Sequence, residues 1–95
     1  MNKQKDMLKR TIEKEVANIL LKDIENIPGF VTVNGIMLSE DGKNVLISVS
    51  VLEKDKEEAV LKRLQSAKEY IRHLLSKRIK TRNLPKIDFV VYKDQ

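Results

Sequence analysis

The densest group of cationic side chains in this sequence lies in the stretch SKRIKTRNLP, residues 76–85. Lys77, Arg78, Lys80 and Arg82 fall within six residues, and no acidic residue lies among them. Lysine and arginine bind phosphates by charge and by hydrogen bonds, so the stretch is a candidate contact for a polyanion. Lys77 and Lys80 could instead be ordinary cations at a helix C-terminus, where the helix dipole favours them by about 0.3–1 kcal/mol. Arg82 lies beyond the expected helix, so the polyanion hypothesis depends chiefly on it.

The positive charge of the chain is concentrated in one third of its length. The formal net charge is +5, but residues 60–87 hold nine basic side chains and a single acidic one, Glu69. Residues 1–59 hold slightly more acidic than basic side chains. Such an asymmetry is typical of proteins that bind a polyanion. The basic residues of the segment are Lys62, Arg63, Lys68, Arg72, Lys77, Arg78, Lys80, Arg82 and Lys86.

Catalytic and metal-binding constellations are not apparent. The chain has no cysteine, and His73 is its only histidine, so a metal site is not expected. The adjacent carboxylates Glu57-Glu58 and Glu40-Asp41 fall at an expected helix start and an expected turn, which favour acidic residues for local reasons. We therefore expect no enzymatic activity, no cofactor and no small-molecule substrate.

Length and composition predict one small domain over residues 1–95, without a separate C-terminal tail. Hydrophobic residues make up 41% of the chain and charged residues 35%, which suits a folded core and not a disordered segment. No apolar run approaches the ~20 residues of a membrane span, and the N-terminus lacks a signal-peptide pattern. We therefore expect a cytoplasmic protein, and a monomer.

Hydrophobic periodicity predicts an α+β domain with the order helix, strand, strand, helix, strand. The short turn between the first two strands makes them antiparallel, and the helical crossover makes the third strand parallel to the second. The second strand is therefore central in a three-stranded mixed sheet whose helices cover one face. The expected elements are helix 4–25, strand 30–38, strand 45–52, helix 55–78 and strand 87–92.

Three local signals refine these elements. Asn34-Gly35 inside the first strand indicates a bulge or, alternatively, a tight hairpin turn with very short arms. Asp55 and Glu58 have the spacing of a capping box at the start of the second helix. Arg78 would fall on the apolar stripe of that helix if it ran straight, so we expect the helix to bend or end there.

Two long blocks of the sequence resemble the ribosome-binding factor A family. The block VTVNGIMLSEDGKNVLISVSVL resembles that family's strand–turn–strand region, with Ser39 and Asp41 at the turn. The block LQSAKEYIRHLLSKRIKTRNLPKIDF is similar to its second region, in which a helix with a kink near Ala67 leads to a basic run, Arg82 and Pro85. The resemblance covers about residues 8–90. One departure is that the family's Ala-x-Gly at the kink is replaced by Ala67-Lys68-Glu69, which suggests a gentler kink.

The resemblance implies a type II KH-like fold and a non-enzymatic role in ribosome biogenesis. A member of this family would bind the small (30S) subunit through 16S rRNA, assist late rRNA processing and maturation, and be linked to cold adaptation. KH domains that read single strands use a GXXG loop, which this sequence lacks. The candidate RNA-binding residues are Arg72, Lys77, Arg78, Lys80, Arg82, Lys62, Arg63 and Lys68.

Base stacking is not expected to contribute to RNA binding. Aromatic residues are scarce, and we expect Phe30 and Phe89 to lie in the core, which leaves phosphate contacts as the binding mode. Some of these cations have an alternative interpretation without a role in RNA binding. The aliphatic stem of Arg72 could cover the core, and Lys62 and Arg63 could serve only to keep the surface soluble. A generic basic domain that binds an acidic protein partner remains the alternative function.

Overall fold

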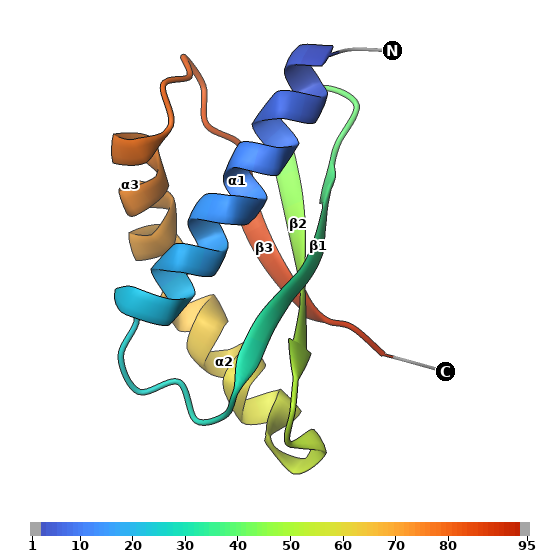
Figure 1. Ribbon diagram of the computed structural model, residues 1–95, viewed down its shortest axis with the longest axis vertical. Helices are drawn as coiled ribbons and strands as arrows, with labels where there is room; N and C mark the ends of the chain where they lie inside the picture. The colour runs from blue at the N-terminus through green and yellow to red at the C-terminus, as the bar shows by residue number, and fades with distance from the viewer. Residues whose placement is uncertain (1–2, 94–95) are drawn as a thin grey trace.

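The structure, a computed structural model, describes residues 3–93; residues 1–2 and 94–95 of the expected domain lie outside the described residues. The described chain forms helices and strands in the expected order (Figure 1). The second helical region is divided into a short 3₁₀ helix and two α-helices. The elements are α1 (Lys3–Lys22), β1 (Val31–Leu38), β2 (Asn44–Val51), η1 (Lys54–Lys56), α2 (Glu57–Ser66), α3 (Lys68–Arg78) and β3 (Lys86–Val91).

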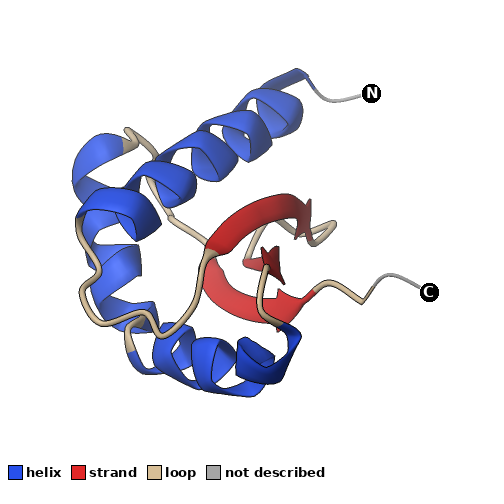
Figure 2. Ribbon diagram, turned by 60° about the horizontal axis from the view of Figure 1, so that its bottom comes forward, coloured by secondary structure: helices blue, strands red, loops and turns tan. Residues whose placement is uncertain are grey.

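The sheet has the strand order β1-β2-β3, with β2 in the centre. β1 is antiparallel to β2, and β3 is parallel to β2, as the turn and the crossover predict. The helices gather on one side of the strands, and no helix of the described chain covers the opposite side (Figure 2). The prediction of an α+β domain with a three-stranded mixed sheet is confirmed.

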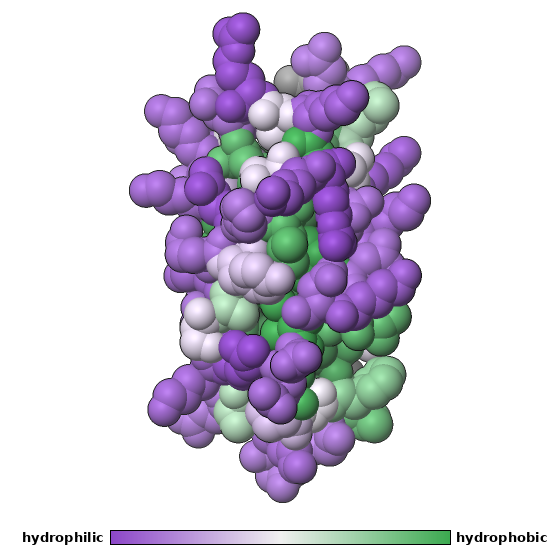
Figure 3. All heavy atoms as spheres, turned by 90° about the vertical axis from the view of Figure 1, so that its left-hand side faces the viewer, coloured by the Kyte–Doolittle hydropathy of each residue, from purple (hydrophilic) through white to green (hydrophobic). Residues whose placement is uncertain are grey.

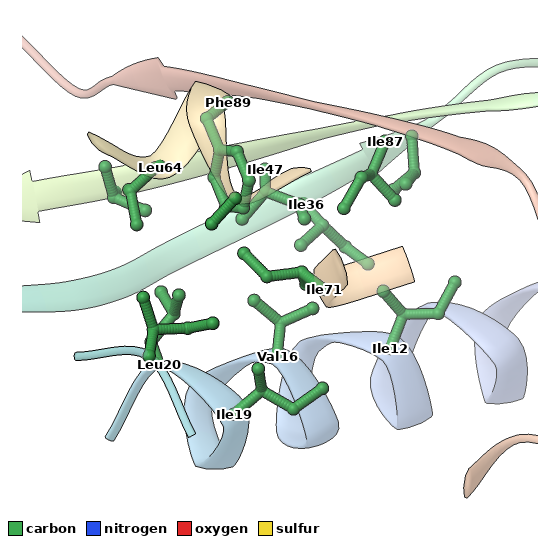
Figure 4. Close-up of a cluster of buried hydrophobic side chains, with 14 of the residues drawn as sticks. Ile12, Val16, Ile19, Leu20, Ile36, Ile47, Leu64, Ile71, Ile87 and Phe89 are labelled. Carbon is green, nitrogen blue, oxygen red and sulfur yellow. The ribbon is translucent and has the colours of Figure 1, made fainter. Parts of the chain in front are cut away.

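One hydrophobic core joins the helices to the inner face of the sheet. Ile12, Val16 and Ile19 of α1 are fully buried and point towards the strands (Figure 4). These α1 residues repeat at helical spacing, and the buried residues of β2 alternate with more exposed ones. The helical period and the strand period therefore each place apolar side chains on the face that meets the core. The buried residues of β2 are Val45, Ile47, Val49 and Val51.

The irregularity in β1 is a bulge. Val33 pairs with Val49 and Gly35 with Ser48, so Asn34 is the additional residue of β1 at this point. The two strands continue to pair on both sides of it, which rules out a hairpin at Asn34-Gly35. Of the two alternatives, the bulge is the one that the structure contains.

The second helical region differs from the single bent helix expected from Asp55. The predicted capping box is wrong: α2 begins at Glu57, and its N-cap, Lys56, makes no side-chain cap. A 3₁₀ turn precedes it, in which the Lys56 amide donates to the Glu53 carbonyl (2.9 Å), so backbone bonds take the place of the cap. At Ala67 (φ −95°, ψ 1°) the chain leaves the helical conformation, and α3 begins at the next residue. The kink is therefore present without a glycine.

The prediction that Phe30 lies in the core is wrong, since 62% of it is exposed. Phe30 precedes β1, and its amide donates to the carboxylate of Glu53 (2.9 Å), which fixes the backbone there and leaves the ring at the surface. Phe89 is buried, as expected. Phe30 belongs to the segment between α1 and β1, which lies at the opposite end of the molecule from the loop after α3 (Figure 1).

Candidate nucleic-acid interface

The loop between α3 and β3 carries the basic stretch at one end of the molecule (Figure 1). α3 ends because Ile79 takes an extended conformation (φ −117°, ψ 120°) and buries its side chain, leaving it 7% exposed. Pro85 is also buried at the other end of the loop. Between these two anchors Leu84 packs against the core, whereas the side chains of Lys80 and Arg82 are exposed.

Arg72 fastens this loop to α3. Its Nε donates to the Pro85 carbonyl (3.0 Å), and its Nη2 donates to the Leu84 carbonyl (2.7 Å). Charge-assisted hydrogen bonds to backbone carbonyls fix the path of a segment that has no secondary structure. Arg72 is half-buried and belongs to the framework that positions Arg82.

Arg78 is engaged with α1. Its Nη2 lies 2.8 Å from Asp23 Oδ2, and its Nη1 lies 3.8 Å from Glu15 Oε1. The Arg78 side chain is 33% exposed, and the side chains of Asp23 and Glu15 are 30% and 24% exposed. Of the four cations in the opening stretch, Arg78 is thus the one whose charge is neutralised within the described part of the protein.

Lys62 and Arg63 lie in α2, at the opposite end of the longest axis from the loop after α3 (Figure 1). Arg63 donates through Nε (3.0 Å) and Nη2 (2.9 Å) to the Glu25 carbonyl, which ties α2 to the segment after α1. Lys68, at the kink, lies 3.9 Å from Asp88. The structure therefore separates these three candidates from Lys80 and Arg82, although all of them share one basic segment of the sequence.

The turn between β1 and β2 brings a cation that the sequence analysis did not single out. The backbone amide of Lys86, the first residue of β3, donates to the carbonyl of Lys43, the last residue of the turn before β2 (2.9 Å), so Lys43 and Lys86 lie side by side at the same end of the molecule. Both line one hollow together with Arg82 and Arg72. The strand order would have revealed this proximity, since a parallel third strand must start beside the start of the second.

Asp41 stiffens that turn. Its Oδ1 accepts hydrogen bonds from the Ser39 hydroxyl (2.6 Å) and the Lys43 amide (3.0 Å). The Ser39 hydrogen bond, followed by the Lys43 amide, lowers the pKa of Asp41 below its usual value of 3.8. Gly42 adopts a positive φ of 72°, which completes the turn. The carboxylate of Asp41 is thus occupied with the local backbone.

In the β1–β2 turn and residues 77–86, five cations have side chains that form no hydrogen bond or ion pair with any of residues 3–93. We call these five residues the basic end. Long hydrophilic side chains project from the upper part of the surface in Figure 3, while hydrophobic residues reach the surface towards its lower right. The basic end comprises Lys43, Lys77, Lys80, Arg82 and Lys86.

Other classes of site are not supported by the described chain. Across residues 3–93 no group of three or more histidine, cysteine, aspartate or glutamate residues could hold a metal ion. His73 is exposed on α3. In the same range, every helix is too short or too polar to cross a lipid bilayer. The unpaired cations of the basic end are the feature that calls for a ligand.

Comparison with known proteins identifies the family. A family model described as ribosome-binding factor A matches residues 4–94. The chain belongs to the ribosome-binding factor A family. A relative of that name from Natranaerobius thermophilus is 34% identical over 88 residues, which cover 90% of this chain and 67% of the relative. The family resemblance inferred from the two sequence blocks is confirmed.

Solved structures of the family share the fold. The crystal structure of ribosome-binding factor A from Thermus thermophilus superposes with a TM-score of 0.84 at 22% identity, covering 95% of this chain and 97% of that one. A homology model of Thermus thermophilus ribosome-binding factor A, fitted into a cryo-EM map of a 30S complex of that protein, gives a TM-score of 0.71 at 26% identity, with 97% and 94% coverage.

Proposed function

We propose that this protein is a non-enzymatic assembly factor that binds the small ribosomal subunit through 16S rRNA and assists its late processing and maturation. Membership of the ribosome-binding factor A family supports the partner, and the related protein fitted into the map of a 30S complex supports it further. The observation that carries the proposal is the basic end, where unpaired cations gather around one anchored loop, whereas Arg78 and Lys68 lie beside carboxylates.

The contacts are made to phosphates. Lys80 and Arg82 project from a loop that is anchored on both sides, so they can approach a backbone without unfolding any element. Exposed Phe30 lies before β1 and far from this loop, so it offers bases no stacking partner beside the cations (Figure 1). Binding through phosphates recognises the shape and position of rRNA helices and not the identity of bases.

The eight cations of the sequence prediction then divide into three groups. Lys77, Lys80 and Arg82 contact rRNA directly, whereas Arg72 holds the loop and Arg78 stabilises the fold at the end of α3. Lys62, Arg63 and Lys68 form a second, weaker contact at most. Lys62 and Arg63 lie on α2, and Arg63 already bonds the Glu25 carbonyl, while Lys68 lines a hollow with Lys86 but lies beside the carboxylate of Asp88.

The cellular location of the protein follows from its ribosomal partner. Ribosomes assemble in the bacterial cytoplasm, so we place the protein there, acting as a monomer that needs no cofactor. We further propose that residues 1–95 work as one domain, since helices and strands from both halves of the described chain share a single core.

Co-sedimentation with purified small subunits tests the proposal. At about 0.15 M salt, loss of one phosphate contact costs about five-fold in affinity, because each contact contributes a slope of about 0.8 to log K against log salt. Replacing Lys80 and Arg82 by glutamine should therefore weaken binding about 20-fold. The matched control replaces Lys54 and Lys56, two exposed lysines of η1 at the opposite end, by glutamine and should bind as the wild type does.

Equal binding of the Lys80/Arg82 variant and the wild type would refute the assignment of the basic end. If the wild-type protein does not bind small subunits but binds an acidic protein, the result would support the alternative function, a generic basic domain with an acidic protein partner. Comparing immature with mature subunits adds the stage of assembly, for which we expect preferential binding to the immature form.

A further inference from the structure

The hollow between the β1–β2 turn and the loop before β3 has the composition of an anion site. Its cationic lining comes from three separate places in the chain: Lys43 from the turn, Arg72 from α3, and Arg82 and Lys86 from the loop and the start of β3. The hollow has a volume of about 640 Å³ and is open to solvent, so a charged polymer can reach it. We call it the turn–loop hollow.

The lining of the hollow carries one negative charge against the four positive charges of Lys43, Arg72, Arg82 and Lys86. Asp41 is its one acidic lining residue, and its Oδ1 accepts hydrogen bonds from the Ser39 hydroxyl and the Lys43 amide. Lys43, Arg82 and Lys86 form no ion pair or side-chain hydrogen bond with any residue between 3 and 93. Three cations without an ion pair therefore share one concave surface with a single carboxylate, Asp41, whose charge attracts Lys43, and the lining keeps a net positive charge.

Arg72 provides a fixed donor at this surface. A guanidinium group has five N–H donors, and Arg72 uses its Nε and Nη2 on the Pro85 and Leu84 carbonyls. Those bonds hold the group half-buried and rigid, so its remaining N–H donors can meet an acceptor without further loss of side-chain freedom. A rigid arginine surrounded by flexible lysines suits a phosphate, whose oxygens accept several hydrogen bonds at once.

We propose that the turn–loop hollow binds a phosphate group, and that on the ribosome this group is a backbone phosphate of rRNA. The second clause rests on the proposed function; the first does not. Lys43 and Lys86 thereby join Arg82 in the binding surface, although Lys43 lies outside the basic segment of the sequence. The rRNA-binding surface then spans the turn, the loop and the start of β3. Contacts at these separate points fix the orientation of the protein on the rRNA.

The test uses the full chain with Lys43 and Lys86 both replaced by glutamine. Two lost contacts should lower affinity for small subunits about 20-fold at about 0.15 M salt and reduce the slope of log K against log salt by about 1.6. The Lys54/Lys56 glutamine variant is the control. Replacing Lys43 and Lys86 by arginine should retain wild-type binding, and unchanged melting curves exclude a folding defect.

A second arm uses inorganic phosphate as the probe and needs no ribosome. Titration of the wild type, followed by amide NMR at constant ionic strength, should shift the signals of Gly42, Lys43 and Lys86, and the Lys43/Lys86 glutamine variant should lose these shifts. Absence of shifts in the wild type together with unchanged subunit binding by the glutamine variant would overturn the proposal.

The outcomes separate this inference from the proposed function. If the Lys80/Arg82 variant loses subunit binding and the Lys43/Lys86 variant does not, the rRNA role of the hollow is refuted while the proposed function stands. If the wild type binds no subunit, the proposed function fails. In that case the phosphate titration alone tests whether the hollow binds phosphate. Amide shifts confined to residues of the hollow would support a site for free phosphate, and the absence of such shifts would refute it.

Discussion

The ion pair between Arg78 and Asp23 should stabilise the fold and contribute little to RNA binding. It joins the last residue of α3 to the segment after α1 with an N–O distance of 2.8 Å. The perturbation is a double-mutant cycle with Arg78→Met, which keeps most of the aliphatic stem, and Asp23→Asn, which keeps the shape.

The magnitude follows from exposure and geometry. Exposed pairs measured in such cycles contribute about 0.2–1 kcal/mol. Both side chains of this pair are about two-thirds covered and hydrogen-bonded, at 33% and 30% exposure, so we expect a coupling free energy near the upper end, about 1 kcal/mol. The contact with Glu15, at 3.8 Å without a hydrogen bond, should add about half as much. Arg78→Met then lowers Tm by about 4–8 °C for each kcal/mol lost.

Urea unfolding followed by circular dichroism gives the four free energies of the cycle. The coupling should shrink in about 1 M salt, because the pair is partly exposed to screening ions. Subunit binding supplies the contrast: Arg78→Met should stay within about two-fold of wild type, whereas the Lys80/Arg82 glutamine variant should lose binding at wild-type stability. A coupling near zero, or a binding loss for Arg78→Met equal to that of the Lys80/Arg82 variant, would refute the structural role.

Three further predictions concern the framework. Gly42→Ala should lower the free energy of unfolding by about 1–2 kcal/mol in urea melts, because its φ of 72° is left-handed, whereas Gly35→Ala, with open space around it, should cost nothing. Val49→Asp should abolish the cooperative thermal transition, because it places an unpaired carboxylate at a fully buried position of the central strand; a normal melt would contradict the core assignment. The lowered pKa of Asp41 means that the folded state binds its proton less readily than the unfolded chain, so this contribution to stability is present above about pH 4 and disappears as pH falls through the folded pKa. Ser39→Ala should weaken that acid dependence, and an identical pH profile of the urea midpoint would contradict it.

Much of the fold follows from local sequence patterns. The periods of 3.6 and 2 place the buried side chains of α1 and β2 correctly, and connection length alone determines the strand order. The capping box failed because the helical region starts with a 3₁₀ turn, in which the carbonyls of Glu53 and Lys54 accept hydrogen bonds from the amides of Lys56 and Glu57. Phe30 was misplaced because its exposure depends on a tertiary bond to Glu53, which is 23 residues away.

The candidate site was predicted less completely. A charge count along the chain cannot distinguish Arg78, which lies beside the carboxylates of Glu15 and Asp23, from Arg82, which forms no ion pair within residues 3–93. A charge count also cannot show that Lys43 lies beside Lys86, because the two residues come together only when the turn and the third strand pack in the fold. The sequence pointed to the loop, and the tertiary structure decides which of its cations are free.

The salt dependence of binding to purified small subunits tests the central claim most directly. If the five cations of the basic end each contact a phosphate, log K should fall with log salt at a slope of about −4 between about 0.05 and 0.3 M. The Lys80/Arg82 glutamine variant should reduce that slope to about −2.4 by the same rule. A wild-type slope near zero, or one that the variant leaves unchanged, would contradict phosphate recognition by the basic end.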